Sequence, residues 1–198
     1  MATPTEAACA VLREVLDHLR TNREHLDRLL EDADEEALRR RPAPDAWSAV
    51  ECFEHLRVTA ALYRPRLEAA LARGRAKGLA GRAPYGRGTW IGRVLLGALD
   101  PDRGESKAVK APGAFRPAAL SELDVATVVR GLREENEHLR RLVVEADGLD
   151  LGRLRLATPI ATFLRLSVDQ AFRVLAWHEA RHLAQAERAL DTAHEDRA

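Results

Sequence analysis

Two histidines near the C-terminus, His178 and His182, are spaced four residues apart, as two ligands of one metal ion on a helix would be. They lie within the segment Trp177–Gln185. The helical period places both on an apolar stripe that should face the protein core, formed by Val168, Ala171, Leu175, His178, His182, Gln185 and Ala189. Because buried polar groups need partners, a shared metal ion is one way to satisfy two imidazoles at once.

The five residues 178–182 also spell the zinc-protease motif, in which Glu179 would act as a general base. A protease of this type needs a further ligand downstream, but Gln185 and Arg188 occupy the near positions and only 16 residues follow His182. We therefore reject the protease and keep the metal geometry. Glu179 remains a candidate catalytic base, although it lies about 100° around the helix from His178, so a salt bridge to an arginine is an equal alternative.

A third ligand must come from another helix, because three protein ligands leave one coordination position open for chemistry. His55 is the best candidate, since it lies with Cys52 and Thr59 on an unusually polar stripe adjacent to the apolar core stripe of its helix. The alternative is that His55, His178 and His182 are three core histidines, each satisfied separately. Three such residues on the inward faces of two helices favour the metal site.

Apolar spacings of three and four residues predict four long helices that would position these side chains, at about 5–32, 48–73, 118 or 121–146 and 167–191. Thr5 is the expected N-cap of the first helix, and capping boxes are expected at Ser48–Glu51 and Ser167–Gln170. Pro65 should kink or end the second helix. Asn22 interrupts the apolar stripe of the first helix, either as a core polar group bonded to a neighbour or as part of a pocket wall.

The segment 73–118 differs from the rest, with nine of the twelve glycines and ten Lys or Arg residues against three acidic ones. One short amphipathic helix is expected at 90–99, and the remainder should be an irregular basic insertion between the second and third long helices. Such an insertion is either a solvated crossover or a basic rim that recruits an anionic substrate.

The composition predicts a soluble, all-α single domain spanning 1–198, with a frayed tail at 192–198. The chain is 46% hydrophobic and has 31 basic and 31 acidic residues, so it offers no global attraction to nucleic acid or membrane. It has no apolar run of the roughly 20 residues that span a bilayer, and no signal-peptide pattern. Two cysteines suggest no disulfide framework, so a cytoplasmic location is expected.

Three segments, namely 47–56, 107–117 and 178–185, resemble the DinB-like superfamily in residue type, order and spacing. The resemblance covers nearly the whole chain. It implies an up-down-down-up four-helix bundle, usually a homodimer, that binds a divalent metal such as zinc or nickel. The implied ligands are His55, His178 and His182. Known members include transferases and isomerases that use low-molecular-weight thiols such as bacillithiol or mycothiol, while many members have no assigned activity.

The leading hypothesis is a metal-dependent hydrolase or thiol S-transferase acting on a small molecule, in which the ion lowers the pKa of a bound water or thiol. Glu51, Cys52, Glu135 and Gln185 are further candidates for the pocket, and Glu51 is a second candidate base. The rival hypothesis is a non-catalytic, stress-related dimeric module that binds metal. Nucleic-acid binding through the basic insertion is the weakest alternative, because the net charge is zero and the insertion has few aromatic residues.

Overall fold

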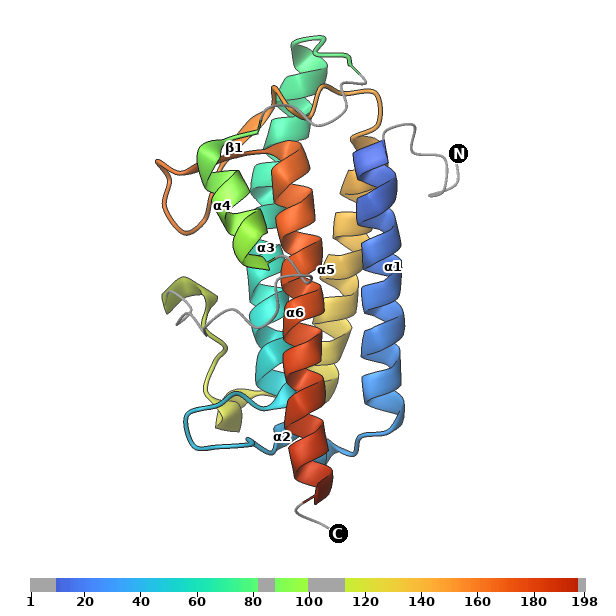
Figure 1. Ribbon diagram of the computed structural model, residues 1–198, viewed down its shortest axis with the longest axis vertical. Coiled ribbons are helices and arrows are strands. Elements are labelled where there is room, and N and C mark those ends of the chain that lie inside the picture. Colours follow the sequence, from blue (N-terminus) through green and yellow to red (C-terminus); the bar gives the residue numbers. More distant parts are fainter. Residues whose placement is uncertain (1–9, 82–87, 100–112, 196–198) are drawn as a thin grey trace.

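Four long helices lie side by side in the computed structural model, which describes residues 10–81, 88–99 and 113–195 (Figure 1). They are α1 (Ala10–Glu31), α3 (Ala49–Ala76), α5 (Val125–Glu145) and α6 (Val168–Glu195). Helices α1 and α6 run in one direction and α3 and α5 in the opposite one. The predominantly helical class predicted from the sequence is therefore confirmed.

Local sequence signals explain where these helices begin. Ser48 caps α3 in a capping box, with the Glu51 side chain accepting a hydrogen bond from the Ser48 backbone N–H at 3.0 Å. Gln170 reaches back to Ser167 in the same way at the start of α6. The capping box predicted at Ser48 is present, and at Ser167 the bonds from Gln170 back to the cap residue are present. Each lies at the start of a helix that carries histidines of interest.

Several predicted helix boundaries were wrong. Helix α3 continues through the exposed Pro65 to Ala76 rather than ending at Pro65 or near residue 73. The third long helix begins only at Val125, where the Asp124 side chain accepts a hydrogen bond from the Thr127 backbone N–H. Helix α6 extends to Glu195, past the predicted start of the frayed tail. The expected cap Thr5 lies outside the described residues.

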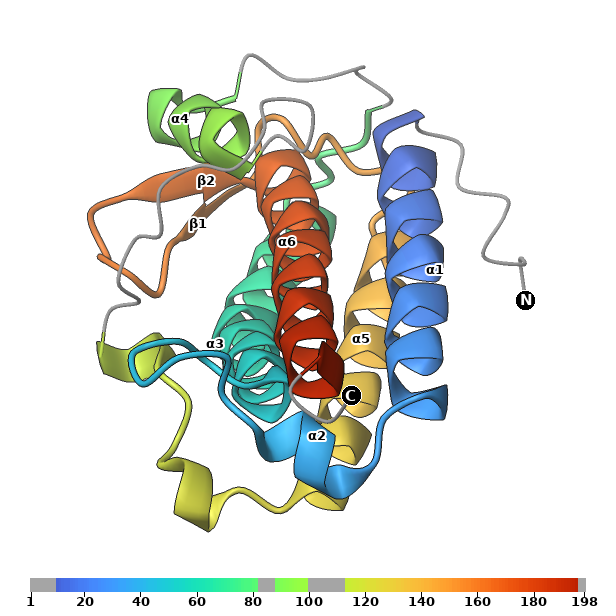
Figure 2. The same cartoon turned by 60° about the horizontal axis from the view of Figure 1, so that its bottom comes forward.

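Shorter elements surround the four long helices. The helix α2 (Glu35–Arg39) and two single-turn helices, η3 (Gly113–Phe115) and η4 (Leu120–Glu122), were not predicted. Helix α4 (Trp90–Leu99) matches the short helix expected inside the basic segment, and it packs beside α6 (Figure 2). The strands β1 (Arg155–Ala157) and β2 (Arg165–Ser167), which were not predicted, pair in a small antiparallel hairpin beside the helices.

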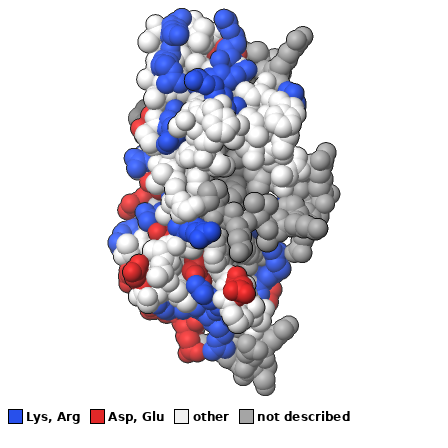
Figure 3. Space-filling model, turned by 90° about the vertical axis from the view of Figure 1, so that its left-hand side faces the viewer, with Lys and Arg blue, Asp and Glu red and all other residues white. Residues whose placement is uncertain are grey.

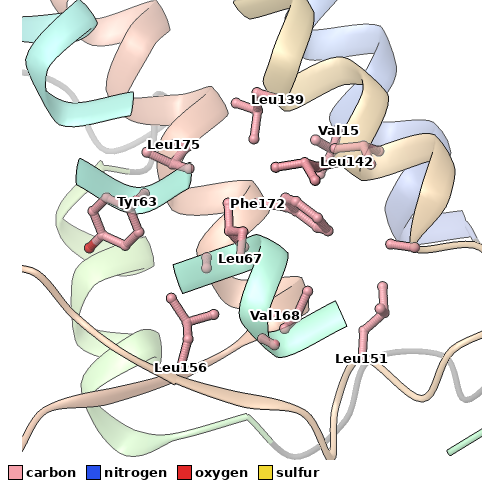
Figure 4. Packing of buried hydrophobic residues seen from close by; sticks show 14 of the residues in the cluster. Val15, Tyr63, Leu67, Leu139, Leu142, Leu151, Leu156, Val168, Phe172 and Leu175 are labelled. Atoms are coloured by element: carbon pink, nitrogen blue, oxygen red, sulfur yellow. The ribbon is translucent and has the colours of Figure 1, made fainter. Parts of the chain in front are cut away.

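The interior consists of two apolar clusters at different heights along the four helices. The first is built from the first half of α1, the second halves of α3 and α5, the first half of α6 and the hairpin (Figure 4). The second lies at the other end, around Leu26, Phe53, Leu132 and Leu183. Between the clusters lies a polar layer that contains buried or half-buried polar side chains from all four helices: Asn22, His55, Thr59, Asn136, His178, Glu179 and His182.

No helix in the described part of the chain combines the length and apolar character needed to cross a bilayer.

Candidate metal centre

Three histidines converge within the polar layer. Each of His55, His178 and His182 offers one ring nitrogen, and these three atoms all lie within 4.8 Å of one another. The ring centroids are 4.5 Å apart for His178–His182, 4.6 Å for His55–His182 and 5.0 Å for His55–His178. The structure therefore brings together the three candidate ligands named from the sequence, one from α3 and two from successive turns of α6.

Hydrogen bonds to the outer ring nitrogens orient two of these imidazoles. His55 Nδ1 lies 2.5 Å from the carbonyl oxygen of Phe115, which can only accept, so this nitrogen donates. His182 Nδ1 donates in the same way to Gln185 Oε1 at 2.9 Å. Each ring is thereby held in the tautomer that leaves a lone pair on Nε2, as in protein metal sites where a second partner fixes the ligating histidine.

The inner nitrogens face one another without a protein group between them. His55 Nε2 and His178 Nε2 are 2.9 Å apart. Nitrogen ligands of a tetrahedral zinc ion, with bonds of about 2.0–2.1 Å, are separated by about 3.3 Å. The three-histidine group thus fits a small divalent cation in donor type and in spacing.

The electrostatic surroundings keep all three rings neutral. Burial lowers the pKa of His55. Burial is also the main reason why the pKa of His182 is lowered to about 3. Burial and the two neighbouring histidines lower the pKa of His178 well below its ordinary value. Neutral imidazole is the form that coordinates a metal, so no proton has to be removed at neutral pH before an ion binds.

Two further residues shape the site although the sequence did not reveal their roles. The Trp47 ring lies 4.9 Å from the His55 ring and 6.0 Å from the His182 ring, so it covers one side of the group. Phe115 acts through its backbone carbonyl, which every residue possesses, so its residue type carried no signal.

Glu179, the first candidate base, belongs to a separate polar network. It is 4% exposed, and its carboxylate accepts hydrogen bonds from Asn22 Nδ2 at 3.0 Å and from Asn136 Nδ2 at 2.5 Å. Burial raises the pKa of Glu179 to about 7 against the opposing effect of these hydrogen bonds. Asn22 also donates to the Ala176 carbonyl oxygen. Asn22 is therefore a core polar group bonded to its neighbours, and the partners of Glu179 are two asparagines rather than an arginine.

Glu51, the second candidate base, is also engaged. Both carboxylate oxygens accept hydrogen bonds from Arg41, and one of them also accepts from Ser48. Although burial opposes the shift, these partners lower the pKa of Glu51 below its ordinary value. Glu51 thus anchors the start of α3 and the segment that precedes it.

The remaining pocket candidates divide into one residue at the site and two beyond it. Gln185 contacts His182 directly, as described above. Cys52 is fully buried, and burial followed by the neighbouring Glu51 raises the pKa of its thiol to about 12, so it is not a nucleophile at neutral pH. Glu135 forms an ion pair with Arg64 at 3.1 Å.

Comparison with known proteins gives one match. The family model described as the DinB superfamily matches residues 18–186, a range that includes all three converging histidines. No curated protein and no solved structure matches the chain. Because the family match covers most of the sequence, the chain belongs to the DinB superfamily.

Proposed function

We propose that this protein is a divalent-metal-dependent enzyme of the hydrolase or thiol S-transferase type, with His55, His178 and His182 as the metal ligands. One observation carries the proposal: three neutral imidazoles from two helices present their inner nitrogens to a common point, and two of them are held there by hydrogen bonds to Phe115 and Gln185. Three protein ligands leave a further coordination position for a small molecule.

The chemistry follows from that donor set. A divalent ion bound by three neutral ligands keeps its full positive charge and lowers the pKa of a coordinated water or thiol, which supplies a nucleophile at neutral pH. His55, His178 and His182 would hold the ion, and the Trp47 ring would lie against one side of it. Membership of the superfamily supports zinc or nickel as the metal, bacillithiol or mycothiol as the thiol, and a homodimer as parts of the same proposal. The small number of cysteines supports a cytoplasmic location.

Family membership also supports a finer description of the fold. We assign α1, α3, α5 and α6 as the helices of an up-down-down-up four-helix bundle, and the segment between α3 and α5 as an insertion.

A second candidate function is a non-catalytic metal-binding module, and one observation favours it. Both candidate bases already accept hydrogen bonds. Glu179 accepts from Asn22 and Asn136. Glu51 accepts from Arg41 and Ser48. Both carboxylates are therefore engaged in hydrogen bonds within the fold. The enzyme proposal therefore relies on the metal to generate the nucleophile, with no protein carboxylate as base.

A direct assay separates these candidates. The protein, purified without an affinity tag, is tested for conjugation of thiols to an electrophile and for ester hydrolysis, each with added zinc or nickel and after chelation. Metal-dependent turnover that is lost in His55→Ala and retained in His138→Ala supports the enzyme. Stoichiometric metal without turnover on either panel supports the module, and a wild-type protein that binds no metal contradicts both.

A further inference from the structure

A basic groove lies between the second half of α3 and the β-hairpin, at the far end of α3 from the three histidines. Its volume is about 570 Å³. Six cationic side chains line it, three from or just after α3 and three from the hairpin region: Arg66, Arg73, Lys77, Arg153, Arg155 and Arg165. None of the described residues that line the groove is acidic, and the remaining ones are Pro, Ala and Leu. Figure 3 shows Lys and Arg gathered at the upper end of this face.

The charge of this groove is not neutralised within the described part of the protein. None of the six cations forms an ion pair there with a carboxylate, although the whole chain has equal numbers of basic and acidic residues. The arginines that do form hydrogen bonds use backbone carbonyls, as Arg66 does with Leu62 O at 2.7 Å. Six like charges in one groove repel one another, so an anion bound there reduces this electrostatic repulsion.

The groove is also held in shape before any ligand arrives. Arg73 donates to the Arg155 carbonyl oxygen at 2.9 Å, which joins α3 to β1. Arg155 in turn donates to the Gly152 carbonyl oxygen. Arg73, Lys77, Arg153 and Arg165 remain exposed. The groove thus combines backbone-anchored guanidinium groups with exposed cations on both sides.

We propose that the basic groove binds a soluble small molecule carrying two or more linked phosphate groups. Guanidinium groups match phosphate oxygens in pairs, and several cations converging on one concavity suit clustered rather than single charges. A volume of about 570 Å³ is in the range of small-molecule sites. Among the described residues no aromatic side chain lines the groove, so they offer no stacking surface of the kind that binds single-stranded nucleic acid.

This groove is distinct from the three-histidine site. Arg66 and Arg73 follow His55 by 11 and 18 residues on the same helix, which at 1.5 Å per residue corresponds to about 16 and 27 Å along its axis. A diphosphate or triphosphate in the groove does not reach the histidines. The proposal therefore stands whether or not the metal proposal holds.

Isothermal titration of the full-length protein with inorganic tripolyphosphate tests the groove. The wild type should bind with one-to-one stoichiometry, and rising ionic strength should weaken binding. The double variant Lys77→Gln/Arg165→Gln removes two cations for which the structure gives no side-chain hydrogen bond, so folding should be preserved. It should bind at least about tenfold more weakly, because two charge-assisted contacts are lost.

Two controls make the result specific. Arg20→Gln/Arg133→Gln removes the same charge from two arginines paired with Glu24 and Asp27 elsewhere on the surface, and should bind like the wild type. His55→Ala should also bind like the wild type, which excludes chelation of a bound metal by the probe.

Absence of tripolyphosphate binding by the wild type, or equal weakening in both double variants, overturns the proposal. A membrane is the competing occupant, because Phe163, at the tip of the hairpin, is 82% exposed. The groove would be assigned to a lipid surface instead if three results came together. The protein would bind phosphatidylcholine vesicles only when they contain phosphatidylserine, Phe163→Ser would abolish this binding, and tripolyphosphate would not bind.

Discussion

Replacing Glu179 by glutamine should change how the stability of the metal-free protein depends on pH. Burial raises the pKa of Glu179 from 4.5 to about 7 in the folded state. Between these two pH values the folded protein holds a proton that the unfolded chain has released. The free energy of unfolding therefore falls as the pH rises from about 4.5 to about 7, and the loss is complete above that range.

The size of this loss follows from the shift. A change of about 2.5 pKa units at about 1.4 kcal/mol per unit gives about 3.5 kcal/mol over the whole range, and somewhat less when the lower pH is 5, an order-of-magnitude value for a single buried carboxyl. Glutamine has no such titration and a similar shape. Asn136 can rotate its amide to accept from the new NH₂ group, while Asn22 keeps its present orientation because it also donates to Ala176.

Urea unfolding of chelator-treated protein at pH 5 and pH 8.5 measures the effect. The wild type should lose about 3 kcal/mol more than Glu179→Gln between these two pH values. The same exchange at the exposed Glu134 controls for the removal of one carboxylate. A difference between wild type and Glu179→Gln that stays constant across this range would refute the assignment of Glu179 as a buried group of the core.

Three further predictions concern the same layer of the protein and the docking of α4. Gln185→Leu removes the acceptor of His182 Nδ1 and should weaken zinc binding by about 10–100-fold at unchanged stoichiometry, as measured by competition with a chromophoric chelator. Burial lowers the pKa of His182 to about 3, so below about pH 6.5 the unfolded chain takes up a proton that the folded protein does not, and the free energy of unfolding falls as the pH falls. Metal-free His182→Gln should therefore lose less stability than the wild type between pH 7 and pH 5 in urea titrations. Gly92→Ala should destabilise the protein by about 1–3 kcal/mol in chemical unfolding, because the new Cβ would lie 2.2 Å from the side chain of Gln170, which is hydrogen-bonded to Thr89. Gly113→Ala is the control: its Cβ would meet no atom within 4 Å, so this change should be neutral.

The sequence was informative where residue type and helical period act together. His178 and His182 share one face of a helix by their spacing alone, and His55 was identifiable because it lies on an unusually polar stripe beside the apolar face of its helix. The capping boxes at Ser48 and Ser167 were visible because they need particular side chains at fixed offsets.

The features that escaped prediction depend on tertiary contacts. The contact between Asn22 and Glu179 joins residues 157 positions apart, and no local pattern indicates which helices meet at that height. The hairpin strands have only three residues each, too few for a reliable alternation of side chains. The basic groove combines residues near 70 with residues near 155, so only the folded chain shows that its cations lie together.

The most direct test of the metal centre is zinc titration of the metal-free protein, with metal content measured after dialysis. The account predicts one tightly bound zinc per chain in the wild type. It predicts loss of that ion in each of His55→Ala, His178→Ala and His182→Ala, and retention in His138→Ala. A wild type that keeps no zinc, or a His55→Ala variant that keeps as much as the wild type, would contradict it.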